Sequence, residues 1–127
     1  MTANQFRRIA LGMSGAVEGS HMDHPDFRAN GRIFATLDHE NVRGMVKLTP
    51  EQQEEFIRND PGTFEPASGA WGRQGCTMVR LSKADEAIVG EAMTLAWQAV
   101  AAMKPAVRKI RAARPAADTR RKKSVPR

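Results

Sequence analysis

The hydrophobic positions at the start of the chain recur first at helical spacing and then in short extended runs. The first spacing predicts a helix over residues 3–12, because apolar residues three and four apart lie on one side of a helix. Residues 16–22 follow as an expected edge strand. The buried stripe of the predicted helix consists of Phe6, Ile9, Ala10 and Met13.

An Asn-Gly dipeptide at positions 30–31 separates two extended runs, 26–29 and 32–38. This dipeptide is typical of a two-residue hairpin, because both residues tolerate the positive φ angles of a type I′ turn. Such a turn sets the register of the two strands. The register places Phe27 opposite Phe34, so we expect an aromatic pair on one face of the hairpin.

A third strand is expected over residues 43–48, and a helix begins after Thr49. Three local signals agree on this start: Thr49 as N-cap, a proline at the first helical position and a glutamine three residues after the cap. The helix is expected to run to about Arg58 and to end before Pro61.

The remaining part is predicted as an irregular segment, a strand and a long helix. Residues 61–75 are rich in glycine and proline, which favours a single long loop. The last strand is expected over 76–81, and Ser82 is expected to cap the helix, with Asp85 as a partial capping box. The predicted buried stripe is Ile88, Ala92, Leu95, Ala96, Ala99 and Met103, widened by Val89, Met93, Trp97 and Val100.

This order of elements predicts an α+β domain, in which a compact antiparallel sheet packs on an N-terminal and a C-terminal helix. The domain is expected to cover residues 1–103. Residues 104–127 consist mainly of alanine, proline, lysine and arginine and contain no aromatic residue. Such a segment buries too little apolar surface to offset its ordering entropy, so we expect a disordered basic tail.

The charge of the chain is divided unequally between these two parts. The whole chain has 20 Lys and Arg, 14 Asp and Glu, and a net charge of +6. Ten of the basic residues and one acidic residue lie in residues 104–127, which therefore carry a net +9. The other 103 residues have ten basic and 13 acidic side chains, a net of −3. The basic character therefore belongs to the tail and not to the domain.

Several motifs occur in the order that is found in the MmcQ/YjbR family. They are His21, Pro25-Asp26-Phe27-Arg28, Gly31-Arg32-Ile33-Phe34-Ala35-Thr36-Leu37, Lys47-Leu48 and Trp71-Gly72-Arg73-Gln74-Gly75. The chain resembles that family over roughly residues 3–103. The resemblance implies a compact fold similar to frataxin and CyaY, and a proposed double-wing DNA-binding role. One departure is Cys76, because the family usually has an aromatic residue there.

The resulting hypothesis is a DNA-binding accessory protein that contacts phosphates without reading the base sequence. Arginines near the hairpin tip and in the loop are expected to orient the nucleic acid, and a tryptophan is expected to stack on a base. The alternatives are an ordinary solvated hairpin and a tryptophan that packs on the core. The candidate residues of the domain are Arg28, Arg32, Arg43, Trp71 and Arg73.

The tail is expected to supply most of the affinity. A dense run of cations binds polyphosphate by releasing counterions, and duplex DNA is the expected partner. The alternatives are a solubilising tail and, for the whole chain, a protein-interaction or small-ligand-binding module in which the tail is incidental. The candidate residues of the tail are Lys109, Arg111, Arg120, Arg121, Lys122 and Lys123.

Other functional classes are not expected. No pattern of a nucleophile with a base, or of a glycine-rich phosphate loop, suggests an enzyme, and no cofactor is expected. The group His21, Asp23, His24 and Asp26 reads as a polar turn, and no metal site is predicted. Iron binding is disfavoured because residues 1–17 contain no carboxylate. Cys76 reads as a buried thiol. Without an apolar span or a signal-peptide core, we expect a cytoplasmic protein without a membrane segment.

Overall fold

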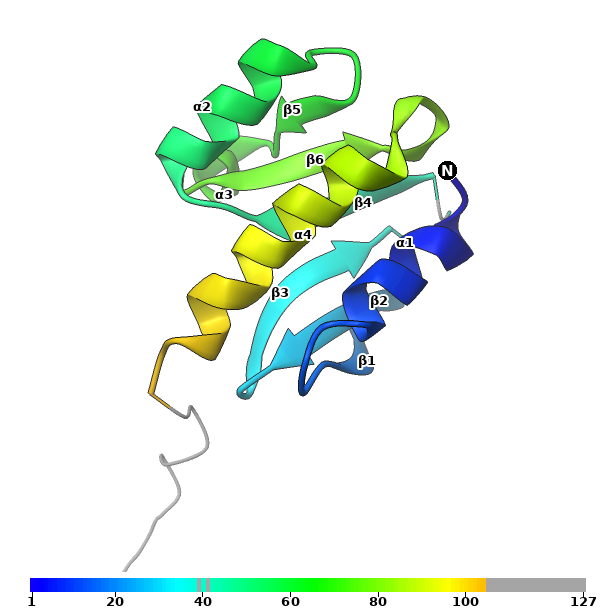
Figure 1. Cartoon of the computed structure of the whole chain (residues 1–127), viewed down its shortest axis with the longest axis vertical. Coiled ribbons are helices and arrows are strands. Elements are labelled where there is room, and N and C mark those ends of the chain that lie inside the picture. The colour runs from blue at the N-terminus through cyan, green and yellow to red at the C-terminus, as the bar shows by residue number, and fades with distance from the viewer. Residues whose placement is uncertain (39, 41, 105–127) are drawn as a thin grey trace, which may run out of the picture.

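The computed structural model describes residues 1–38, 40 and 42–104 (Figure 1). The predicted tail from residue 105 onward lies outside the described residues, so the division at residue 103 stays a prediction. The helices and strands are α1 (Ala3–Leu11), β1 (Val17–His21), β2 (His24–Ala29), β3 (Arg32–Leu37), β4 (Arg43–Lys47), α2 (Pro50–Asn59), β5 (Phe64–Pro66), α3 (Gly69–Arg73), β6 (Cys76–Arg80), the short 3-10 helix η1 (Leu81–Lys83) and α4 (Glu86–Ala101).

The strands form one sheet of six in the order β1-β2-β3-β4-β6-β5. Every neighbouring pair is antiparallel. The three strands that follow β1 are connected by short turns, whereas α2, β5 and α3 lie between β4 and β6 in the sequence. The sheet therefore has two edges, β1 and β5.

Helices α1, α2 and α4 cover one face of this sheet. Figure 1 shows α1 and α4 side by side across the strands, and α2 lies over the β5 end. Phe6 of α1 is completely buried, and Phe56 of α2 packs edge-on against Phe64 of β5, with ring centroids 5.3 Å apart. The core lies between the helices and the sheet. The prediction of an α+β domain with N- and C-terminal helices on an antiparallel sheet is confirmed.

The hairpin between β2 and β3 has the predicted turn but not the predicted aromatic pair. Asn30 and Gly31 have φ angles of 57° and 76°. The expected register continues only to Arg28, which lies opposite Ile33, and a bulge then places Phe27 opposite Ala35. The pairing of Phe27 with Phe34 was wrong, because the bulge puts one extra residue, Phe34, in β3. Both phenylalanines are nevertheless fully buried.

The predicted start of α2 is confirmed and that of α4 is wrong. The Thr49 side chain accepts a hydrogen bond from the Gln52 amide, and the Gln52 side chain returns one from the Thr49 amide. Ser82 lies instead in η1, and the N-cap of α4 is Asp85, which accepts from the Ile88 amide. The buried side of α4 is accordingly centred on Val89, Ala92, Met93, Ala96 and Val100.

The segment 61–75 was predicted as one irregular loop, and this prediction was wrong. It contains the short edge strand β5 and the one-turn helix α3. Gly72 explains why α3 has no strong signal in the sequence. A Cβ atom at Gly72 would lie 1.8 Å from the carbonyl oxygen of Ala67, so glycine is required by a contact with backbone before the helix. The side-chain amide of Gln53 in α2 donates to the carbonyl oxygens of Gly72 and Cys76, at 3.0 and 2.9 Å. The helix is thus held by contacts with the rest of the chain rather than by helix propensity.

Candidate functional site

The face of the sheet opposite the helices carries the candidate site. Side chains point alternately to the two faces of a strand, and cross-strand partners share a face. One row of partners crosses this face from β1 to β5. The row consists of Gly19, Asp26, Thr36, Met45, Met78 and Glu65. We call this surface the open face.

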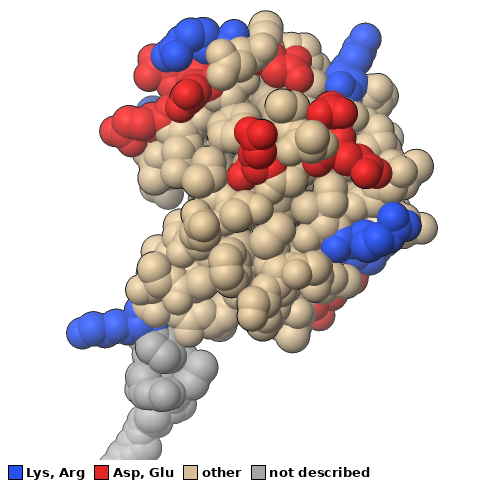
Figure 2. Space-filling view, viewed as in Figure 1, with Lys and Arg blue, Asp and Glu red and all other residues tan. Residues whose placement is uncertain are grey.

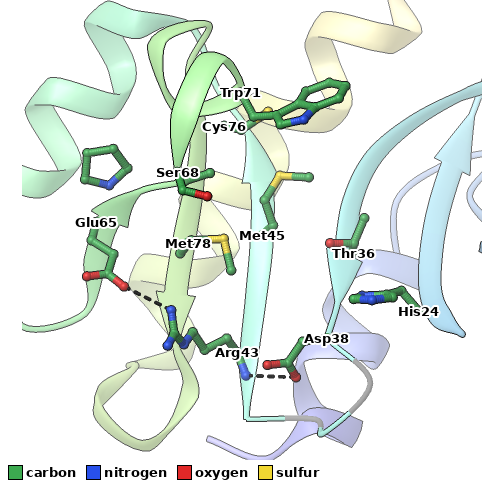
Figure 3. Close-up of a pocket in the computed structure, with 12 residues that line it drawn as sticks. His24, Thr36, Asp38, Arg43, Met45, Glu65, Ser68, Trp71, Cys76 and Met78 are labelled. Atoms are coloured by element: carbon green, nitrogen blue, oxygen red, sulfur yellow. Dashed lines mark hydrogen bonds and ion pairs between the residues drawn. The ribbon is translucent and has the colours of Figure 1, made fainter. Parts of the chain in front are cut away.

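A hollow of about 480 Å³ lies on the open face. Figure 3 shows Met45 and Met78 in the middle of it, Trp71 at one end, and Arg43 and Asp38 at the other. The complete lining is His24, Thr36, Asp38, Arg43, Met45, Glu65, Pro66, Ala67, Ser68, Trp71, Cys76 and Met78. The hollow therefore combines an apolar centre with polar groups at its margin, as small-molecule sites commonly do.

Trp71 is unusual because 65% of this large side chain is exposed. It belongs to α3, which ends at Arg73, shortly before β6 begins at Cys76. Because Trp71 is 65% exposed, the sequence alternative in which it packs on the core is wrong, and its indole is available for stacking.

The turn after α3 requires glycine. Gly75 has a φ of +111°, and a Cβ atom there would lie 1.9 Å from the carbonyl oxygen of Leu48.

Two arginines share one carboxylate beside the hollow. Arg43 Nη1 donates to Glu65 Oε2 at 3.2 Å, and Arg80 Nη2 donates to Glu65 Oε1 at 2.8 Å. All three side chains are partly exposed. The group carries one positive charge in excess. A guanidinium has five N–H donors, so the single bond from Arg43 to Glu65 leaves donors for a ligand.

A second polar cluster lies nearer the β1 edge. Asp26 is fully buried. Its Oδ1 accepts from Arg28 Nε at 2.8 Å and its Oδ2 accepts from Arg28 Nη2 at 3.0 Å. His21 Nδ1 lies 2.8 Å from the same Oδ2. The hydrogen bonds from Arg28 hold the pKa of Asp26 below its ordinary value, against the opposing effect of burial. Asp26 in turn raises the pKa of Arg28. The arginine is therefore partly neutralised by its neighbour.

Cys76 lies at the Trp71 end of the hollow and is 5% exposed. Burial raises the pKa of its thiol, and nearby Lys47 opposes this only partly. A thiol with a raised pKa is a weak nucleophile at neutral pH. The sequence interpretation of Cys76 as a buried small side chain agrees with this position.

The structure brings together two of the five candidate residues of the domain. Arg43 and Trp71 line the same hollow. Arg28 lies on the open face but outside the hollow, where it binds Asp26. Arg73 is exposed on α3, and Arg32 lies at the hairpin turn. The tail candidates, Lys109, Arg111, Arg120, Arg121, Lys122 and Lys123, lie outside the described residues.

The hairpin turn packs against the end of α4. The side-chain amide of Asn30 donates to the carbonyl oxygens of Val100 and Met103, at 3.0 and 2.6 Å. The Arg32 guanidinium donates to the carbonyl oxygen of Lys104. These bonds join the hairpin turn to carbonyl groups at the end of α4 and just beyond it. The basic segment of the sequence thus begins directly beside Arg32.

Sequence reasoning missed most of the hollow. The missed residues include His24, Thr36, Met45 and Met78, which come from four strands. Alternation along the strand starting at Cys76 does separate Met78 from the buried Val79. That signal cannot show which face the helices cover, so it could not identify a binding surface.

The side of the molecule formed by α2 and α4 is acidic. Figure 2 shows most of the red side chains across the upper half of this side, with blue groups at its upper left and upper right, and an uncharged area below them in the middle of the view. Among the described residues, these helices and the α4 cap carry one cation, Arg58. The exposed carboxylates are Glu51, Glu54, Glu55, Asp85, Glu86 and Glu91. This side repels polyanions, whereas the cations Arg28, Arg43, Lys47 and Arg80 belong to the open face.

The part of the chain that the structure describes has neither a cluster of metal ligands nor a membrane-spanning helix. No three His, Cys, Asp or Glu side chains within 1–38, 40 and 42–104 come together as a possible metal site. No helix in this part of the chain is long and apolar enough to cross a membrane.

The fold and the open face define a two-layer α+β protein with helices on one side of a six-stranded antiparallel sheet. The YjbR family model matches residues 11–99, and the chain belongs to the YjbR family. The crystal structure of Deinococcus radiodurans protein DR2400, which contains domain DUF419, is similar with a TM-score of 0.69. The similarity covers 80% of this chain and 79% of that chain at 19% identity, which shows a shared fold. No curated protein matches the sequence.

Proposed function

We propose that this chain is a DNA-binding accessory protein, in which residues 104–127 supply affinity without sequence preference and the open face orients the nucleic acid. The observation that carries the proposal is the net charge of +9 in these 24 residues. A segment of this charge density binds polyphosphate through counterion release.

The arrangement of charge on the domain supports the same function. The acidic side formed by α2 and α4 disfavours DNA, which leaves the open face as the more favourable surface. Lys104, where the basic segment begins, lies beside Arg32 at the hairpin turn. DNA bound by the segment is therefore held close to this end of the sheet. On the open face the four cations Arg28, Arg43, Lys47 and Arg80 outnumber the carboxylates Asp26, Asp38 and Glu65, and this excess of one positive charge favours phosphate there.

The hollow supports a second candidate, a small-ligand-binding module. Its volume of about 480 Å³ lies within the range of known small-molecule sites, and methionines give it an adaptable apolar centre. In this case the basic segment is incidental to the function. The two candidates differ in their dependence on salt, because counterion release makes nucleic-acid affinity fall steeply with salt concentration.

The test is fluorescence anisotropy with a labelled DNA duplex across a salt series. Full-length protein is compared with a variant in which Arg120, Arg121, Lys122 and Lys123 are changed to glutamine. Each lost phosphate contact lowers the slope of log affinity against log salt by about 0.9, so the four changes together are expected to lower it by about 3 to 4. Arg58→Gln on the acidic side is the matched control and is expected to leave the slope unchanged.

A full-length protein that shows no affinity for the duplex at low salt would contradict the proposal. Equal slopes for the wild type and the glutamine variant would show that these four cations make no phosphate contact. Strong binding of a small ligand to the domain, together with absent DNA binding, would support the second candidate.

A further inference from the structure

The hollow on the open face has the features of a site for one flat aromatic ring. Trp71 forms one end, with an indole that is 65% exposed. Met45 and Met78 are cross-strand partners in the centre, and their thioethers face the hollow (Figure 3). Sulfur makes favourable contacts with aromatic rings, and unbranched methionine side chains adapt to rings of different shape. An aromatic ligand can therefore stack on Trp71 and rest on the methionines.

The polar margin of the hollow supplies both donors and acceptors. Arg43 contributes N–H groups beyond the one that binds Glu65. Asp38 Oδ1 accepts from the amides of Val42 and Arg43, at 3.0 and 3.3 Å, which holds the carboxylate at the end of the hollow. Donors suit a phosphate and acceptors suit the N–H groups of a base. This combination, together with the stacking surface, matches a nucleotide better than a purely apolar ligand.

A base pair inside a duplex cannot use this site. Its bases are stacked on their neighbours and present only their edges in the grooves. An unpaired base exposes its flat faces, and proteins that bind single strands use such faces for stacking on aromatic side chains. The exposed indole therefore selects for a strand whose bases are free.

We propose that the hollow binds one unpaired nucleobase of a single strand, stacked on Trp71 above Met45 and Met78, with the adjoining phosphate at Arg43. This inference rests on the proposed nucleic-acid-binding function and adds the class of nucleic acid to it. The basic segment holds any nucleic acid near the domain, and the hollow discriminates in favour of single-stranded regions.

The experiment compares three labelled probes with the full-length protein: a thymidine strand, an abasic strand of the same length and a duplex. The two strands have the same phosphates, but only the thymidine strand has bases. A difference in their affinities therefore reports contacts of the bases. Base stacking on an aromatic side chain makes the thymidine strand the tighter ligand by about five- to a hundredfold. Trp71→Ala is expected to abolish this difference and to leave duplex affinity unchanged. The matched control Trp97→Phe, on α4, is expected to retain the difference.

Because Trp71 is mostly exposed, its replacement is expected to leave the fold intact, and thermal melting checks this. Arg43→Gln provides an independent variant, expected to weaken binding of the thymidine strand more than binding of the duplex. Equal affinity of the wild type for the thymidine and abasic strands would overturn the inference. So would a preference for thymidine that survives Trp71→Ala. If the duplex still binds with a steep salt dependence in either case, the proposed function stands and only this inference fails. If no probe binds, both fail.

Discussion

Gly44 is the second residue of β4, and it lies directly beneath the ring of Phe6 from α1. A Cβ atom added at Gly44 would be 2.5 Å from both Cε1 and Cζ of Phe6, and 3.0 Å from Cδ1. Ordinary contacts begin at 3.4 Å, so the ring would have to retreat by roughly 1 Å. Phe6 is fully buried and packs on Phe27, with ring centroids 6.2 Å apart. We therefore predict that Gly44→Ala destabilises the domain.

The magnitude follows from two opposing effects. Inserting a methyl group into a well-packed core typically costs about 1–3 kcal/mol. Replacing glycine by alanine also reduces the entropy of the unfolded chain, which stabilises by about 0.4–1 kcal/mol. The expected net loss for Gly44→Ala is about 1–2 kcal/mol. For a domain of this size, that loss lowers the melting temperature by roughly 5–15 °C.

The assay is urea unfolding followed by tryptophan fluorescence and circular dichroism, with thermal melting as a second measurement. Gly90→Ala in α4 is the matched control, because a Cβ there meets no atom within 4 Å. This control is expected to stabilise the protein by about 0.5–1 kcal/mol, since glycine is unfavourable inside a helix. The same substitution is thus predicted to have opposite signs at the two positions.

A double-mutant cycle tests the cause of the destabilisation. Phe6→Leu removes the ring atoms that meet the new methyl group, so Gly44→Ala should cost less in that background, with a coupling of at least about 0.5 kcal/mol. A Gly44→Ala protein as stable as the wild type would refute the reasoning. Strict additivity with Phe6→Leu would also do so, because the loss would then have another source.

Two further predictions concern Asp26 and Cys76. Asp26→Asn removes a buried acceptor of two hydrogen bonds from Arg28 and should cost about 1–3 kcal/mol at neutral pH. Because the pKa of Asp26 is lowered in the folded state, its contribution is present above the ordinary value of 3.8 and is lost as pH falls below it. Urea midpoints should therefore differ between wild type and variant at pH 7, and the difference should shrink as the pH is lowered below 3.8. A constant difference would count against this assignment. Cys76, whose thiol pKa is raised by burial, should react with Ellman's reagent far more slowly in the folded than in the urea-unfolded protein at pH 7. Equal rates would show that the thiol is accessible.

Local signals in the sequence predicted those parts of the fold that depend on neighbouring residues. The turn at Asn30-Gly31 requires positive φ angles, and few residue types tolerate them. The capping box at Thr49 and Gln52 joins groups three residues apart. Both predictions are confirmed, since the interactions that stabilise them are formed within a single turn of the chain.

The predictions that failed concern features that no short pattern of residues encodes. The turn sequence does not reveal the bulge at Phe34, so the turn alone gave the wrong partner for Phe27. The helix α3 depends on the approach of Gly72 to Ala67, and its sequence has no strong helix signal. The N-cap of α4 moved from Ser82 to Asp85 because η1 occupies the intervening residues.

The candidate site shows the same division. The sequence by itself determined the excess of positive charge in residues 104–127, the predominantly acidic domain and the family motifs, because these are properties of composition and order. Only the tertiary structure decided that Trp71 stays exposed, that Arg43 lies in the same hollow, and that Arg28 is bound by Asp26. Helices cover one face of the sheet and leave the other open, and this choice requires long-range packing that no short pattern of residues encodes.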